Sequence, residues 1–285
     1  MSHRETIVRG QPAVELSART GDRLVVALHG GHLLSWQDAD GTERLYLSPT
    51  ALFDGRSAIR GGVPICFPQF NQRGPLPKHG FARNLPWTFA GETAPDAWTL
   101  RLTDSDATRA FWPERFGLDL TLSVPRAGVL RIALQVANTG AAPWSFTAAL
   151  HTYLRVDELA DARLLGLQGA PCWDAVRDAR ATETRDAIGF GEEFDSVYGA
   201  PAQPLLLRQP RGDLHIASSP DCPQTVVWNP GPALCARLAD MPADGWRHML
   251  CVEAAAIDAP VELAPGAATV LWQQLDARPS SSPTA

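Results

Sequence analysis

Short stretches in which apolar and polar residues alternate recur along the chain. Every second residue is apolar in residues 118–124, and the pattern returns in residues 130–136 after the turn sequence Pro125-Arg-Ala-Gly128. Because successive side chains of a β-strand point to opposite faces of its sheet, each stretch predicts a strand with one buried face. Two such strands around a Pro/Gly turn predict an antiparallel hairpin.

Similar stretches fill much of the remaining sequence. They occur at residues 22–29, 98–103, 205–207, 224–228, 248–256 and 269–276. No series of helical segments of about 10–15 residues runs between them, which favours a β-sandwich over parallel βαβ units. The 23 glycines and 24 prolines require many turns and leave little room for long helices. We therefore expect an all-β fold.

The sequence predicts a single structural domain. It contains no interior linker rich in Pro, Gly or Ser and no repeat of fixed period. Its last residues are poor in apolar side chains, which is typical of a disordered terminus. We expect one β-sandwich domain over residues 1–277, followed by a disordered tail over residues 278–285.

Charge and cysteine content limit the classes of partner. The 25 Lys and Arg against 31 Asp and Glu give a net charge of −6, whereas nonspecific nucleic-acid binding requires a basic surface. No run approaches the ~18 apolar residues of a membrane span, and the first residues lack the apolar stretch of a secretory signal. Five widely spaced cysteines indicate reduced thiols. We expect a cytoplasmic protein that binds neither nucleic acid nor membrane.

Residues 144–156 place a histidine among small and polar side chains. If this segment is one strand, one face carries apolar residues such as Trp144, and the other carries Ala149, His151 and Tyr153. A histidine on such a face either meets solvent or lines a pocket. The strand pattern alone leaves both alternatives open.

Glu253 interrupts the otherwise apolar strand of residues 248–257. An ionised carboxylate loses its hydration when it is buried, so Glu253 requires either a cationic partner or a catalytic role. Burial would raise the pKa of its carboxyl towards the range of a general base, whereas a neighbouring cation would lower it. His248 and Cys251 are three residues apart and face opposite sides of a strand, so they do not form a metal site together.

Two segments rich in Gly and Pro carry a group of cationic side chains and a histidine. Arg60 precedes a Gly-Gly pair, and Lys78, His79 and Arg83 share the sequence Lys-His-Gly-Phe-Ala-Arg. Loops on a rigid sheet often hold ligands, and a guanidinium group matches phosphate oxygens and vicinal hydroxyls. The glycine spacing is not that of a nucleotide-binding loop. These residues predict either a packed loop with surface charges or a site for a sugar or small anion.

Six short motifs occur in one order along the chain. They are Arg60-Gly-Gly-Val-Pro, Lys78-His-Gly-Phe-Ala-Arg83, His151-Thr-Tyr-Leu, Phe194-Asp-Ser-Val-Tyr198, Val227-Trp-Asn-Pro230 and Cys251-Val-Glu-Ala254. In this order they resemble the glucose-6-phosphate 1-epimerase branch of the aldose 1-epimerase, or galactose mutarotase-like, family. The resemblance implies an antiparallel β supersandwich with few short helices, whose concave face holds a sugar.

The same resemblance implies roles for individual residues. His151 matches the catalytic histidine of the family, and Glu253 matches its catalytic glutamate. Residues expected to bind the substrate or line its pocket are Arg60, Lys78, His79, Arg83 and Asp195. Lys78 stands where close members carry Gln, and an ammonium group donates hydrogen bonds but accepts none. Trp228 is interpreted as a stacking or packing residue.

The resulting hypothesis is an isomerase that interconverts the α and β anomers of glucose 6-phosphate. Glu253 would take the proton of the C1 hydroxyl while protonated His151 donates to the ring oxygen, and closure on the other face would reverse these roles. Because only protons move, we expect no metal and no redox cofactor. The expected partner is a small sugar phosphate, and we expect a monomer.

Three alternatives remain open at this point. A neutral-sugar aldose 1-epimerase would use the same acid–base pair. A noncatalytic carbohydrate-binding sandwich would have no need of a buried glutamate opposite a histidine. Glycoside cleavage by two carboxylates, Asp195 and Glu253, is a third chemistry that the residue types permit.

Overall fold

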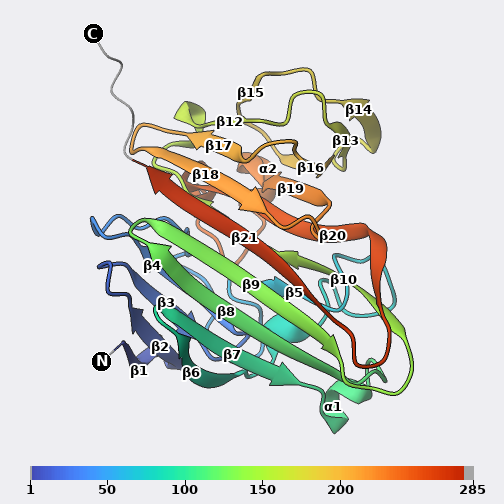
Figure 1. The fold of residues 1–285 in the computed structure, drawn as a ribbon. Helices are drawn as coiled ribbons and strands as arrows, with labels where there is room; N and C mark the ends of the chain where they lie inside the picture. The colour runs from blue at the N-terminus through green and yellow to red at the C-terminus, as the bar shows by residue number, and fades with distance from the viewer. Residues whose placement is uncertain (1, 279–285) are drawn as a thin grey trace.

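Three antiparallel β-sheets make up the part of the chain that the computed structural model describes, residues 2–278 (Figure 1). The smallest sheet has four strands in chain order: β1 (His3–Val8), β2 (Gln11–Ser17), β3 (Arg23–Ala27) and β4 (His32–Gln37). The predicted all-β fold is confirmed.

The largest sheet has nine strands and contains the predicted hairpin. Its spatial order is β15 (Ala187–Ile188), β12 (Arg163–Leu165), β17 (Leu205–Arg208), β18 (Asp213–Ser218), β21 (Ala268–Arg278), β9 (Val129–Asn138), β8 (Phe116–Arg126), β7 (Ala97–Thr103) and β6 (Thr88–Ala94). Strands β8 and β9 pair with Leu120 opposite Leu134, as the alternating pattern predicts. The C-terminal strand β21, red in Figure 1, lies beside the green β9.

The third sheet has eight strands. Its spatial order is β14 (Ala179–Thr182), β13 (Pro171–Asp174), β16 (Phe194–Gly199), β19 (Gln224–Asn229), β20 (Met249–Leu263), β10 (Trp144–Leu150) and β5 (Ile65–Cys66). The eighth strand, β11 (Tyr153–Arg155), also pairs with β20. Strand β20 therefore has β19 along one side and the β10–β11 segment along the other.

Helices are few and short. The two α-helices are α1 (Asp106–Arg109) and α2 (Gly231–Cys235), and single 3-10 turns occur at η1 (Ala82–Asn84), η2 (Leu159–Asp161) and η3 (Gly245–His248). Helix α1 begins with a capping box in which Ser105 and Thr108 exchange side-chain to backbone hydrogen bonds. Within residues 2–278, no helix is long and apolar enough to cross a membrane.

One apolar cluster is shared by all three sheets, and it covers one face of β20. Val252 and Ala254 of β20 belong to this core. Because strand side chains alternate, Cys251, Glu253 and Ala255 point to the opposite face. That face, turned away from the shared core, is the outer face of the eight-stranded sheet.

The segment expected as one strand over residues 144–156 is two strands. Between β10 and β11 the chain bends at His151 and Thr152, where the N–H of Thr152 donates to the carbonyl of Leu150 at 2.9 Å. Side chains continue to alternate between the two faces of the sheet on both sides of the bend, because Leu150 and Leu154 lie in the shared core and Tyr153 does not.

Two expected boundaries also differ from the structure. Strand β20 begins at Met249, and His248 ends the 3-10 turn η3. At the C-terminus, Arg278 is the last residue of β21 instead of the first residue of a tail. The rest of the expected tail, residues 279–285, lies outside the described residues.

Candidate functional site

One cavity on the outer face of the eight-stranded sheet brings together every site residue predicted from the sequence. Its volume is about 390 Å³. The predicted residues that line it are Arg60, Lys78, His79, Arg83, His151, Asp195 and Glu253. Tyr153, Arg73, Trp173 and Trp228 complete much of its wall. Segments far apart in the sequence therefore meet at one place.

His151 and Glu253 occupy opposite positions on neighbouring strands. Leu150 pairs with Ala254 and Tyr153 pairs with Cys251, so the same register places His151 across from Glu253. His151 Nδ1 lies 3.3 Å from Glu253 Oε1. Only 8% of His151 and 1% of Glu253 are exposed, so the alternative of a solvent-facing histidine is wrong.

Aromatic rings fix the orientation of the His151 imidazole. It stacks on Tyr153 with ring centroids 4.9 Å apart and an interplanar angle of 10°. Trp228 and His79 meet it edge-on, at centroid distances of 6.1 Å and 5.5 Å. Its Nδ1 is fully buried beside Glu253, which leaves Nε2 as the nitrogen available to a ligand.

Burial controls the protonation of this pair. Desolvation raises the pKa of Glu253 well above its usual value, and the nearby charge of Asp195 adds to this effect. Desolvation lowers the pKa of His151 well below its usual value, and His79 and Arg83 lower it further. Both pKa shifts favour a neutral His151 imidazole beside a protonated Glu253 carboxyl. The pair therefore holds one proton over a wide range of pH.

His79 is held as a neutral hydrogen-bond donor. Its Nδ1 accepts the backbone N–H of Asn71 at 3.3 Å and lies 3.2 Å from Cys66 Sγ, so the ring proton is carried by Nε2. Burial, reinforced by Arg83, lowers the pKa of His79 to about 3. The loop is shaped by Gly80, where φ is 70° and a Cβ would lie 2.1 Å from the carbonyl oxygen of Phe67.

Arg60 is bound on two sides by protein groups. Its Nε contacts both carboxylate oxygens of Asp240 at 3.2 Å, and its Nη1 donates to the hydroxyl of Tyr153 at 3.1 Å. The glycines that follow Arg60 permit close backbone contacts, since a Cβ on Gly62 would lie 2.1 Å from the carbonyl oxygen of Leu33. Arg60 is thus oriented towards the cavity with its charge offset by a carboxylate.

The other three cations of the cavity divide into paired and unpaired groups. Arg73 pairs with Asp258 at 2.9 Å. Arg83 donates from Nη2 to the carbonyl of Lys78 at 2.9 Å, and its Nε is buried without a hydrogen-bond partner. Within residues 2–278, neither Arg83 nor Lys78 forms an ion pair with a carboxylate. These two residues supply the uncompensated positive charge of the cavity.

Asp195 lies on β16 and lines the cavity. It is half-buried, and desolvation raises the pKa of its carboxyl to about 6, against the opposing effect of Lys78. No side-chain hydrogen bond ties it to another residue in the described range. It is therefore free to accept hydrogen bonds from a ligand's hydroxyl groups.

Three potential metal-binding atoms also meet beneath this cavity. One donor atom each from His151, Cys251 and Glu253 lies within 4.8 Å of the others, and all three residues are buried. The sequence analysis considered Cys251 only with His248, rejected that pair, and so missed the contact across two strands. His248 itself is half-buried elsewhere, with Nδ1 2.7 Å from the carbonyl oxygen of Asp157.

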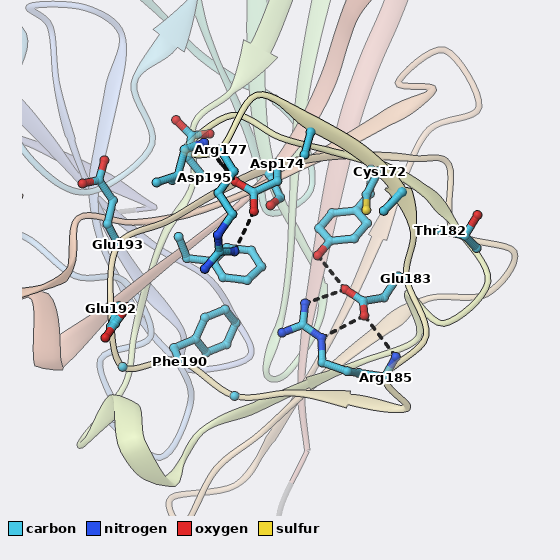
Figure 2. Close-up of a pocket in the computed structure, with 18 residues that line it drawn as sticks. Cys172, Asp174, Arg177, Thr182, Glu183, Arg185, Phe190, Glu192, Glu193 and Asp195 are labelled. Atoms are coloured by element: carbon cyan, nitrogen blue, oxygen red, sulfur yellow. Dashed lines mark hydrogen bonds and ion pairs between the residues drawn. The ribbon is translucent and has the colours of Figure 1, made fainter.

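A second cavity, of about 350 Å³, lies against the other face of β13 and β16 (Figure 2). Alternate residues of these strands line it, such as Tyr198, whereas Val197 lines the first cavity. Both of its arginines are paired, Arg177 with Asp174 and Arg185 with Glu183. Glu183, which Figure 2 shows beside Arg185, forms an ion pair with it at 2.7 Å. The hydroxyl of Tyr198 donates to the same carboxylate at 2.9 Å. It lacks the acid–base pair of the first cavity.

Comparisons with known proteins give a consistent result. Residues 12–276 match the family described as Aldose 1-epimerase. A protein of Escherichia coli (strain K12) named "Putative glucose-6-phosphate 1-epimerase" is 40% identical over 237 residues, which cover 80% of this chain and 78% of that protein. A protein of the same name from Cenchrus ciliaris is 34% identical over 253 residues, which cover 85% of this chain and 77% of that protein.

Solved structures share the fold. A crystal structure from Salmonella typhimurium, described as a "putative mutarotase", matches with a TM-score of 0.89 and 30% identity over 98% of this chain and 94% of that chain. A galactose 1-epimerase from Lactobacillus acidophilus matches with a TM-score of 0.73 over 98% of each chain. At 14% identity, the second match is informative for the fold alone.

Proposed function

Because this chain belongs to the aldose 1-epimerase family, we propose that it interconverts the α and β anomers of an aldohexose 6-phosphate, with glucose 6-phosphate as its substrate. The observation that carries this proposal is a buried His151–Glu253 pair in a cavity with two unpaired cations, Arg83 and Lys78. The names of the relatives from Escherichia coli and Cenchrus ciliaris support the same substrate.

The reaction begins with opening of the sugar ring. In the reactive protonation state, the Glu253 carboxylate accepts the proton of the C1 hydroxyl. The imidazolium of His151 donates from Nε2 to the ring oxygen, and the C1–O5 bond breaks to give the open-chain aldehyde. Rotation about the C1–C2 bond then presents the other face of the aldehyde. Closure returns the proton from Glu253 to O1 while His151 takes the proton of the O5 hydroxyl.

The pair needs only one proton for the whole cycle. Ring opening moves that proton from His151 to Glu253 through the sugar, and ring closure moves it back. Since burial raises the pKa of Glu253 and lowers the pKa of His151, both transfers of ring opening run towards the neutral pair.

The phosphate is held by the 78–83 loop. Arg83 and Lys78 form no ion pair with a carboxylate of residues 2–278, whereas Arg60 and Arg73 are paired with Asp240 and Asp258. A phosphate dianion gains most from unpaired cations, and a guanidinium group can bind two of its oxygens at once. This assignment leaves the sugar hydroxyls to Arg60 and gives Lys78 part of the phosphate, a division that the sequence analysis left open.

The remaining polar groups suit the sugar ring. The guanidinium of Arg60 and the Nε2–H of His79 can donate hydrogen bonds to sugar hydroxyls, and the Asp195 carboxylate can accept them. Trp228 provides an apolar edge beside His151. Arg60 and His79 are anchored by protein groups before the substrate binds, which reduces the conformational cost of orienting the ring for proton transfer.

Exchange NMR at anomeric equilibrium tests this function. Glucose 6-phosphate and glucose are compared side by side, each against its spontaneous rate. We expect fast exchange of glucose 6-phosphate and a much lower kcat/KM for glucose. Equal kcat/KM for the two sugars would identify a neutral-sugar epimerase, and no acceleration of either would contradict an enzymatic function.

A further inference from the structure

Cys251 has no task in proton transfer, although it lies beside both groups that perform it. Its Sγ is within 4.8 Å of donor atoms of His151 and Glu253, and none of its surface is exposed. The other buried cysteines of residues 2–278, Cys66, Cys222 and Cys235, each have a hydrogen-bond partner, whereas Cys251 has none. A buried polar group without a partner requires an explanation.

We propose that His151, Cys251 and Glu253 form a site for one thiophilic divalent cation of the zinc type, and that the bound cation inhibits the enzyme. The inhibitory effect rests on the catalytic roles proposed above for His151 and Glu253. The binding of the cation depends only on the three side chains.

The geometry suits this donor set. Zn²⁺ binds Cys sulfur at about 2.3 Å and His nitrogen or carboxylate oxygen at about 2.0–2.2 Å in a tetrahedral arrangement. Such bonds place neighbouring ligand atoms about 3.3–3.8 Å apart. The present separations, all within 4.8 Å, reach this range by small side-chain rotations. His151 and Glu253 line the cavity, so the site borders the cavity through these two residues.

The polar atoms at this site lack competing partners. His151 Nδ1 and both carboxylate oxygens of Glu253 are buried without an aligned hydrogen bond. No Lys or Arg forms an ion pair with Glu253 within the described residues. A cation therefore displaces no structural contact when it takes these lone pairs.

Charge and protons balance on binding. A hydrated dication loses water to the three ligands, the thiol releases its proton to solvent, and Glu253 releases the proton that it holds. Thiolate and carboxylate together offset the two positive charges, so the buried site remains neutral overall. Burial raises the pKa of Cys251 well above its usual value, so cation binding must compete with protons for this thiol. No electron transfer is involved.

The nature of the donors selects the class of cation. A thiolate with an imidazole favours Zn²⁺, Co²⁺ and Cd²⁺ over Mg²⁺ and Ca²⁺, which take oxygen ligands. A cation in this position occupies the Glu253 carboxylate and the Nδ1 lone pair of His151, so Glu253 cannot accept a proton and His151 cannot become the imidazolium. Proton transfer to and from the sugar then stops.

Absorption spectroscopy with Co²⁺ as the probe tests the site. A Co²⁺ titration of the intact protein should produce one thiolate-to-cobalt charge-transfer band per chain, with the intense visible bands of tetrahedral Co²⁺, and added Zn²⁺ should remove them. Cys251→Ser should lose the thiolate band. Cys66→Ser, the matched control, removes another buried thiol near the cavity and should retain it. Cys251→Ala serves as a second variant if Cys251→Ser does not fold.

Zn²⁺ inhibition of anomer exchange is measured on the same samples. Metal-free Cys251→Ser should exchange anomers at close to the wild-type rate. Its half-inhibiting Zn²⁺ concentration should rise by about tenfold or more, because losing even a residue that only contacts a metal ligand commonly weakens metal binding by about that factor. A band that persists in the folded Cys251 variants, or the same half-inhibiting concentration as wild type, would overturn the site. A Cys251-dependent band in a protein without anomer exchange would instead contradict only the proposed enzymatic function.

Discussion

His151 Nδ1 lies 3.3 Å from Glu253 Oε1, across the boundary between β20 and the β10–β11 segment. Strand pairing fixes this distance, because the two residues occupy opposite positions in a continuous register. The pair is buried, so neither group is easily charged without the other. A rigid, one-proton pair of this kind is suited to moving a proton between two oxygens of a bound sugar.

The pH profile of kcat should be broad and bell-shaped. Below the lowered pKa of His151 the pair gains a second proton, and above the raised pKa of Glu253 it loses its only one. Activity should therefore stay level through neutral pH and fall on both sides. The measured quantity is kcat, since the substrate phosphate titrates near pH 6 on its own, about its second pKa. A single transition at the ordinary histidine pKa of 6.5 would contradict this account.

Substitution of Arg83 should affect the phosphorylated sugar selectively. Arg83→Ala should weaken glucose 6-phosphate binding by about 1–3 kcal/mol, since a charge-assisted contact is lost, with little effect on glucose. Lys78→Gln should show the same selectivity with a smaller loss, because Lys78 is exposed. Calorimetric titration of both sugars measures these effects.

Arg73 provides the control for this comparison. It lines the same cavity but is paired with Asp258, so Arg73→Gln should change the two affinities by similar amounts. Equal losses for both sugars in Arg83→Ala would place Arg83 at the ring hydroxyls and leave the phosphate to another residue.

Stability should fall in mild acid partly because of His32. Burial lowers the pKa of this histidine from 6.5 to about 4, while its Nε2 lies 2.7 Å from the carbonyl oxygen of Gly61. At pH values between about 4 and 6.5, His32 of the unfolded chain binds a proton that His32 of the folded chain does not. The free energy of unfolding should thus decrease as pH falls, by up to about 1.4 kcal/mol per pH unit for this one group.

His32→Gln removes this titration and retains an amide donor towards Gly61. Urea unfolding of wild type and variant, compared across the pH window between about 4 and 6.5, should show a shallower pH dependence in the variant. Identical slopes would mean that His32 is protonated in the folded protein.

Exhaustive treatment with a chelator should not reduce anomer exchange. The proposed mechanism moves only protons, and the three residues that can bind a cation include both proton carriers. Removal of contaminating Zn²⁺ should, if anything, increase the rate. A loss of activity that one metal ion restores would overturn the proton-transfer mechanism.

Local patterns predicted the strands and marked several residues that line the cavity. Alternation located the β8–β9 hairpin, because each of these strands has one buried face. Glu253 was identifiable because a carboxylate in an apolar strand is costly unless it has a role. The six motifs placed Arg60, Arg83 and Asp195 in one site, and the cavity contains all three.

What the sequence could not provide is pairing between distant segments. Asp240 offsets the charge of Arg60 from a loop 180 residues away, and no local signal marks it. Cys251 meets His151 only because β20 pairs with the β10–β11 segment in one particular register. The bend at His151 was also missed, since alternation continues through it and only the hydrogen bonds reveal the break.

The variant Glu253→Gln addresses the central role of the acid–base pair. Gln preserves the size of the side chain, yet its amide cannot accept the C1 hydroxyl proton. Sugar-phosphate affinity should change little, because Arg83 and Lys78 remain. Glu193→Gln, which replaces an exposed carboxylate at the edge of the same cavity, is the matched control and should remain active.

The most direct measurement is the anomer exchange rate of saturating glucose 6-phosphate with the folded Glu253→Gln protein, followed by exchange NMR. The account predicts that kcat falls by about 10²-fold or more, as expected for a lost general base. A folded Glu253→Gln protein that binds glucose 6-phosphate and exchanges its anomers at the wild-type rate would contradict the assignment of Glu253 as the base.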